Sequence, residues 1–98
     1  MIPYESVLDL IGNTPLVDVS RLSPNPNVRI IAKLENQNPF GSVKDRIAKA
    51  MVEDAEKHGR LMPGQTIVEP SSGNTGIALA AIAQIKGYPI KILMPTSV

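Results

Sequence analysis

The sequence contains no cysteine and no tryptophan, and only 3% of its 98 residues are aromatic. The absence of cysteine excludes disulfide bonds, thiolate metal ligands and cysteine nucleophiles. No apolar run approaches the ~18 residues that span a bilayer, and the first residues lack the basic and apolar regions of a signal peptide. We therefore expect a cytoplasmic protein without a metal site, whose core is built from aliphatic side chains.

An excess of charge of either sign is also missing. Ten lysines and arginines face nine acidic residues, which gives a net charge of +1. This balance gives no reason to expect nucleic acid or an anionic membrane as a partner. A hydrophobic content of 43% and a charged content of 19% are typical of a globular chain. Its length allows at most one small domain.

The order of the predicted elements indicates the fold class. A helical turn over 5–11 and an extended segment over 14–19 come first. From about residue 28 the expected order is strand, helix, strand, helix, strand, over 28–35, 43–57, 66–70, 77–86 and 88–95. This alternation predicts an α/β fold, a three-layer αβα arrangement with a mostly parallel sheet. Because such folds normally add a helix after a strand, the chain looks cut short.

The stretch Asn38–Arg46, NPFGSVKDR, is predicted to be a loop that turns into a helix. Ser42 suits an N-cap, and Asp45 follows it three residues later. Lys44 then lies in the first turn, where free N–H groups make a cation unfavourable. That positive field favours the neutral amine that a Schiff-base lysine needs. The ordinary alternative is a solvated lysine whose charge Asp45 partly offsets.

The helix that follows has an apolar stripe at helical spacing. We expect this stripe to pack inward, with one acidic residue in it: Val43, Ile47, Ala50, Met51, Asp54 and Ala55. The later helix, over 77–86, is apolar nearly all round. We therefore expect it to be buried on more than one side.

A second loop, Ser71–Gly76, joins a predicted strand to that apolar helix. Its small residues let an anion approach the N–H groups at the helix start. Four of its side chains add donors: Ser71, Ser72, Asn74 and Thr75. It holds no cation, so it suits a carboxylate better than a polyphosphate. If both loops follow strands of one parallel sheet, they open onto one crevice. The alternative is an ordinary capped turn.

Four motifs together resemble the cysteine synthase family. This is the O-acetylserine sulfhydrylase and cystathionine β-synthase branch of the fold-type II pyridoxal-phosphate enzymes. The motifs are IGNTPLV at 11–17, KLE at 33–35, NPFGSVKDR at 38–46 and EPSSGNTG at 69–76. Their order and spacing are highly specific, and the resemblance covers essentially the whole chain. It is a resemblance to the amino-terminal portion, incomplete relative to the two-domain fold of the family.

The resemblance implies a cofactor, pyridoxal 5′-phosphate, and roles for both loops. Lys44 is implied to hold the cofactor as an internal aldimine and later to remove the substrate α-proton. Asn74 is implied to bond the cofactor 3′-hydroxyl. The substrate carboxylate is implied to bind Ser71, Ser72, Gly73, Asn74 and Thr75. The implied reaction is β-replacement of O-acetylserine, or a related activated serine, by a sulfur nucleophile to give L-cysteine.

The resemblance also implies domains and partners. Residues 1–35 are implied to pack partly on a second domain, and residues 36–98 to form part of a small α/β domain that carries both loops. Beside the amino-acid substrate, the implied partners are a second copy in a homodimer and a serine acetyltransferase tail.

Two alternatives stay open. One is a non-catalytic fragment that binds small carboxylates, or the carboxyl terminus of a partner, through Ser71–Thr75. The other is an activity like that of cystathionine β-synthase or of a serine/threonine dehydratase. The sequence fixes neither the sulfur donor nor the acceptor substrate.

Overall fold

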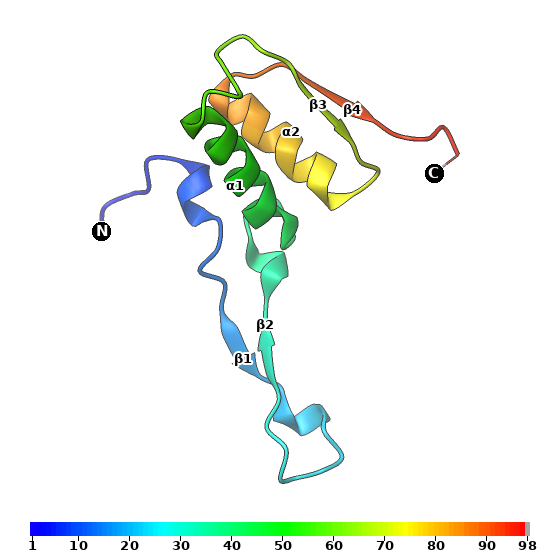
Figure 1. Cartoon of the computed structure of the whole chain (residues 1–98). Coiled ribbons are helices and arrows are strands. Elements are labelled where there is room, and N and C mark those ends of the chain that lie inside the picture. The colour runs from blue at the N-terminus through cyan, green and yellow to red at the C-terminus, as the bar shows by residue number, and fades with distance from the viewer. Residues whose placement is uncertain (98) are drawn as a thin grey trace.

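The computed structural model describes residues 1–97 and shows a helical body from which a two-stranded arm projects (Figure 1). The body contains α1 (Lys44–Lys57), β3 (Ile67–Pro70), α2 (Asn74–Lys86) and β4 (Ile90–Leu93). The arm contains β1 (Leu16–Asp18) and β2 (Ile31–Lys33), and three short 3-10 helices are η1 (Val7–Leu10), η2 (Ser20–Leu22) and η3 (Glu35–Gln37). The radius of gyration of 17.2 Å exceeds the ~13 Å of a compact domain of this length because the arm extends from the body.

The body is an α/β unit. Strands β3 and β4 pair in parallel, with Ile67 opposite Ile90 and Pro70 opposite Leu93. The connection between them is α2, which packs on the sheet, as a parallel crossover requires. The predicted α/β class and the order strand, helix, strand, helix, strand are confirmed.

The structure differs from the expected single sheet at one strand. β2 pairs antiparallel with β1, with Val17 opposite Ala32, in a sheet separate from β3 and β4. Residues 19–30, which include η2, join these two strands, and closing a connection of this length costs only modest loop-closure entropy. Within residues 1–97, α1 and α2 also lie on one side of the β3–β4 sheet, so the second helical layer is not formed there (Figure 1).

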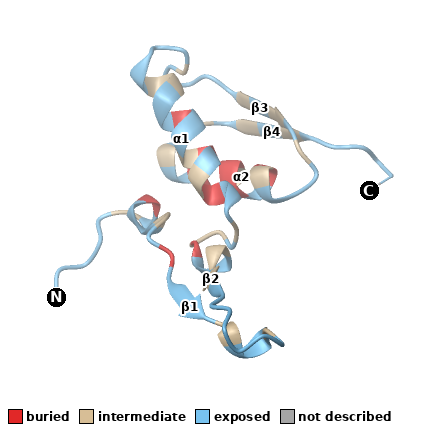
Figure 2. Ribbon diagram, turned by 60° about the horizontal axis from the view of Figure 1, so that its bottom comes forward, coloured by how far each residue is buried: buried red, intermediate tan, exposed pale blue. Residues whose placement is uncertain are grey.

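The core lies where α1 and α2 face each other (Figure 2). Its central residue, Ile82, is fully buried. The surrounding buried apolar residues come from η1, α1 and α2: Leu8, Ala48, Val52, Ala78, Leu79 and Ala83. α2 packs on both α1 and the sheet, which confirms its predicted burial on more than one side, although Ile77 and Ile85 remain exposed.

The predicted inward face of α1 is wrong. Val43, Ile47 and Met51 are 47%, 48% and 41% exposed. The buried residues are Asp45, Ala48 and Val52, of which Ala48 and Val52 lie one position after Ile47 and Met51. One position corresponds to about 100° of rotation about the helix axis. The small side chain of Ala48 lets α2 approach closely, and its neighbours Asp45 and Val52 are buried with it.

The predicted helix ends are confirmed by two glycines. Gly59 and Gly87 have φ of 71° and 83°, the left-handed conformation that glycine adopts at a helix end. On either side of Gly87, the Lys86 amine and the Tyr88 hydroxyl donate to the two carboxylate oxygens of Glu56, at 2.8 and 2.6 Å. This contact ties the ends of α1 and α2 together.

No helix within residues 1–97 has the length and apolar character needed to cross a membrane.

Candidate active site

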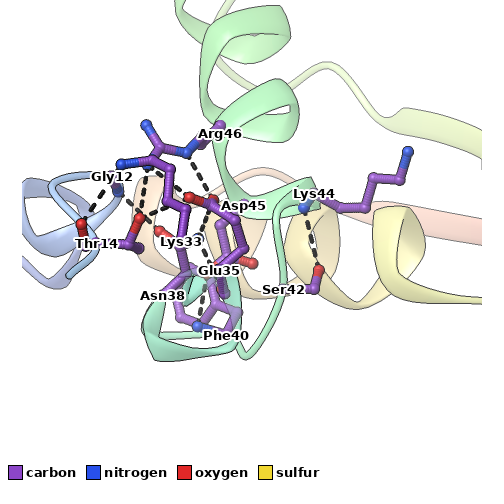
Figure 3. A network of polar contacts seen from close by, with 10 residues as sticks. All are labelled: Gly12, Thr14, Lys33, Glu35, Asn38, Phe40, Ser42, Lys44, Asp45 and Arg46. Carbon is purple, nitrogen blue, oxygen red and sulfur yellow. Dashed lines mark hydrogen bonds and ion pairs between the residues drawn. The ribbon is translucent and has the colours of Figure 1, made fainter. Parts of the chain in front are cut away.

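Lys44 is the first residue of α1, and its side chain is exposed. Its backbone N–H donates to Oγ of Ser42 at 3.1 Å, but the N-cap residue is Val43, one position after the predicted Ser42. Figure 3 shows the Lys44 side chain extending away from the other labelled side chains. Its amine has no hydrogen-bond or ion-pair partner within residues 1–97. Such an amine is available to a carbonyl ligand.

The next residue, Asp45, is completely buried. Its Oδ2 accepts the backbone N–H of Phe40 at 2.7 Å and so fixes the loop that precedes Lys44. The ordinary alternative, a solvated lysine, agrees with the exposure of Lys44, but Asp45 is buried and no ion pair joins the two residues in the described chain. The second oxygen, Oδ1, is buried without a partner within residues 1–97.

The third residue of this turn, Arg46, forms a bidentate pair with Glu35 (Figure 3). Its Nε donates to Oε2 at 2.7 Å and its Nη2 to Oε1 at 2.9 Å. Oγ1 of Thr14 accepts from Nη2 at 3.1 Å and donates to Oε1 of Glu35 at 2.6 Å. Nδ2 of Asn38 donates to Oε2 of Glu35 at 2.9 Å, and its Oδ1 accepts the N–H of Gly12 at 2.8 Å. We call these five residues the Arg46 network.

The Arg46 network joins three of the four motifs singled out in the sequence. The motifs at 11–17, 33–35 and 38–46 meet at the start of α1 (Figure 3). Gly12, with φ of 84°, lies so close that a Cβ there would be 3.0 Å from Nη1 of Arg46. Sequence reasoning used these motifs for the resemblance but gave these five residues no role. The signal in the sequence was a pair of opposite charges, Glu35 and Arg46, in two motifs that had no other role for them.

Acid is expected to weaken the Arg46 network. The hydrogen bonds from Arg46 and Thr14 lower the pKa of Glu35 from 4.5 to about 2. Since the pKa is lower in the folded state, the stability that Glu35 contributes is complete above about pH 4.5 and is lost as the pH falls toward about 2. We expect the Tm, followed by circular dichroism, to fall over this range.

Glu35→Gln is the control for this acid response, because glutamine does not titrate. Its Tm is expected to fall less steeply than that of the parent, with the remaining slope due in part to Glu56, whose pKa is lowered by Lys86 and Tyr88. An equally steep fall in both proteins would show that Glu35 is not a source of the pH dependence.

The second predicted loop joins β3 to α2. Oγ of Ser71 accepts the N–H groups of Gly76 and Gly73, at 3.0 and 3.3 Å. Because a hydroxyl oxygen has two lone pairs, the single hydrogen of Ser71 remains as a donor. The other predicted carboxylate-binding residues are exposed or half-buried at this turn: Ser72, Gly73 and Asn74 exposed, and Thr75 half-buried.

A cavity of about 220 Å³ lies beside this loop, lined by Ser71, Ser72, Gly73, Gly76, Ile77, Ile92 and Met94. Gly76 allows the close packing here, since a Cβ at this position would be 3.2 Å from Oγ of Ser71 and 3.3 Å from Cγ2 of Ile92. A second cavity, of about 230 Å³, lies between α1 and β3 and includes none of the predicted site residues. We therefore take the cavity at the loop as the candidate carboxylate site; Lys44, Asn74 and Thr75 are not among its lining residues.

The starts of α1 and α2 lie at the same end of the helix pair. The two helices pack side by side and run in the same direction, with Lys44 and Asn74 as their first residues (Figure 1). The expected cause, two strands of one sheet, is not the observed one, because β2 belongs to the arm. Parallel packing of the helices brings their N–H ends together, and such ends favour anions.

Comparison with known proteins identifies the family. A family model described as pyridoxal-phosphate dependent enzyme matches residues 7–98. Cysteine synthase B of Salmonella typhimurium is 58% identical over 85 residues, which are 87% of this chain and 28% of that protein.

Two solved structures have the same fold over this chain. The hydrogen sulfide-producing enzyme Fn1220 of Fusobacterium nucleatum has a TM-score of 0.93 and 48% identity, over 100% of this chain and 32% of its own. O-acetylserine sulfhydrylase isoform 3 of Entamoeba histolytica has a TM-score of 0.90 and 42% identity, over 99% of this chain and 30% of its own. The chain thus spans less than a third of the length of these three relatives. It belongs to the family of pyridoxal-phosphate dependent enzymes, and it corresponds to the amino-terminal portion of the cysteine synthases.

Proposed function

We propose that this chain carries the cofactor lysine and the substrate loop of a cysteine synthase. The reaction is the replacement of the β-substituent of O-acetylserine, or of a related activated serine, by a sulfur nucleophile to give L-cysteine. The observation that carries the proposal is the exposed Lys44 amine, which has no partner within residues 1–97 and starts a helix whose next two side chains are held. The similarity to cysteine synthase B and to O-acetylserine sulfhydrylase supports it.

The residues of this chain fit one part of a pyridoxal 5′-phosphate site. Lys44 offers the amine for the aldehyde carbon, and Asn74, at the neighbouring helix start, offers an amide for a ring hydroxyl. The bound cofactor supplies an electron sink for the amino-acid substrate. Lys44 would then serve as the base for the substrate α-proton.

The Ser71–Thr75 loop is proposed to bind the substrate carboxylate. The Ser71 hydroxyl retains its hydrogen as a donor. The N–H groups of Asn74 and Thr75, the first two of α2, have no partner within the helix, whereas those of Gly73 and Gly76 donate to Ser71. Ser72, Gly73, Asn74 and Thr75 complete the turn around this position. We extend the proposal to the implied partners: a second copy of the full-length protein, and a serine acetyltransferase tail whose terminal carboxylate enters this loop.

A second candidate is carboxylate binding without catalysis. It is favoured by the loop itself, whose donors all come from this chain. Calorimetry with O-acetylserine and without pyridoxal phosphate separates the two functions. Heat of binding that Ser71→Ala abolishes supports this candidate, and the absence of heat counts against it.

The cofactor lysine can be tested by chemical trapping. We expect pyridoxal 5′-phosphate followed by borohydride to label Lys44 in preference to the other five lysines: Lys33, Lys49, Lys57, Lys86 and Lys91. The label is located by peptide mass mapping. Lys44→Ala is expected to lose the preferred label and the associated absorbance band.

The matched control is Lys57→Ala, which removes an exposed lysine at the other end of α1. This variant is expected to keep the label on Lys44. Labelling spread evenly over the six lysines of the parent would overturn the assignment of Lys44.

A further inference from the structure

We propose that the Arg46 network positions the Lys44 amine for its reaction with the cofactor, which makes Glu35 and Arg46 positioning residues of the site. This inference rests on the proposed role of Lys44.

Two of the first three side chains of α1 are held in place, and this limits the third. Lys44, Asp45 and Arg46 are consecutive, so their side chains leave the helix about 100° apart. Asp45 is held inside the body by the N–H of Phe40, and Arg46 is held against Glu35. With two of the three directions fixed, rotation of this turn about the helix axis is prevented. The direction in which the Cα–Cβ bond of Lys44 leaves the helix is thereby set (Figure 3).

The Arg46–Glu35 pair also anchors the start of α1. The first N–H groups of a helix lack partners within it, so a helix start frays unless other groups hold it. The far end of α1 is tied by Glu56 to Lys86 and Tyr88. At the near end, the bidentate Arg46–Glu35 pair makes the corresponding anchor. A bidentate pair fixes orientation as well as distance.

The network also bears on which of two lysines, Lys33 or Lys44, has a free amine. Lys33 precedes Glu35 by two residues, and its amine donates to the backbone oxygen of Thr14 at 3.4 Å. The segment that carries the Arg46 network thus engages the Lys33 amine, whereas the Lys44 amine has no partner in the described chain. Loss of the network is expected both to loosen Lys44 and to release Lys33.

The test measures the initial rate at which pyridoxal 5′-phosphate and borohydride label Lys44, divided by the rate at Lys57 in the same molecule. General unfolding changes both rates, but loss of positioning changes their ratio. In Glu35→Gln and Arg46→Lys we expect the ratio to fall about tenfold, since small misplacements of a reacting group have effects of this size or larger. The label on Lys33 is expected to rise.

The matched control is Glu56→Gln. It breaks an ion pair at the opposite end of the same helix, with an N–O distance of 2.8 Å against 2.7 Å for Arg46–Glu35 and side chains of similar exposure. This variant is expected to keep the ratio of the parent. An equal fall in Glu56→Gln and Glu35→Gln would overturn the inference, because the effect would then follow stability alone.

The outcomes separate the two proposals. A parent without preference for Lys44 refutes the proposed function, and the inference fails with it. A parent with this preference, which Glu35→Gln and Arg46→Lys retain, refutes the inference alone. If either variant loses the helical circular dichroism of the parent, Thr14→Val decides. This smaller change removes one partner of Arg46 and of Glu35, and an unchanged ratio in it would refute the inference.

Discussion

Ile82→Ala is expected to lower the free energy of unfolding by about 2–5 kcal/mol, the usual range for truncating a buried isoleucine. Ile82 is 0% exposed and is one of the two largest fully buried side chains among residues 1–97. It packs with residues of η1, α1 and α2, so its removal leaves a cavity at the junction of all three. Because a domain of this size is stabilised by only about 5–15 kcal/mol, this is a large share.

The matched control is Ile85→Ala, which deletes the same atoms from the next turn of the same helix. Ile85 is 44% exposed, so its loss leaves no closed cavity, and the expected change is below about 1 kcal/mol. Urea unfolding of the parent and both variants, followed by circular dichroism, measures the difference. Equal losses in the two variants would show that Ile82 does not occupy the core described above.

Asp45→Ala is expected to lower the free energy of unfolding by about 1–3 kcal/mol, the range for leaving a buried hydrogen-bonding group without a partner. The group left unpaired is the N–H of Phe40, which now donates to Oδ2 of Asp45. The loop before Lys44 is expected to loosen at the same time. Amide hydrogen exchange of this loop, measured beside urea unfolding, should show both effects.

Two variants serve as controls for Asp45→Ala. Asp45→Asn retains an oxygen acceptor for Phe40 and is expected to be more stable than Asp45→Ala. Glu53→Ala removes an exposed carboxylate from the same helix and is expected to change the stability by no more than about 0.5 kcal/mol. If Asp45→Ala is as stable as Glu53→Ala, the bond to Phe40 contributes nothing measurable.

Features coded by neighbouring residues were predictable from the sequence. Both helices end at the predicted residues, Lys57 and Lys86, and the glycines that follow allow the left-handed backbone there. The loop Ser71–Gly76 was recognised from its small residues, and α2 was recognised as buried on two sides from its composition. The position of Lys44 in the first turn of α1 followed from Ser42, whose Oγ accepts the N–H of Lys44, although the N-cap residue is Val43.

Features that depend on distant partners were not predictable. The stripe through Val43, Ile47 and Met51 is more apolar than the face that α1 buries, so periodicity alone selected the wrong side. The buried face of α1 includes Asp45, and nothing in the local pattern indicates that this carboxylate is buried.

The pairing of Arg46 with Thr14 and Glu35 was missed for the same reason. Arg46 and Thr14 are 32 positions apart, and charged residues such as Arg46 and Glu35 are usually exposed. The four sequence motifs therefore indicated the family, but only the folded chain shows that three of them form one contact.

The position of the Arg46 network in the chain has a consequence for the order of folding during synthesis. All five of its residues precede residue 47, whereas the core around Ile82 needs α2 and the β3–β4 sheet needs residues up to 93. The contact between Thr14 and Arg46 joins residues 32 positions apart, and the entropy lost in closing such a loop is modest. As the ribosome extends the chain, the turn that holds Lys44 can therefore form before the helix that buries the core has been made.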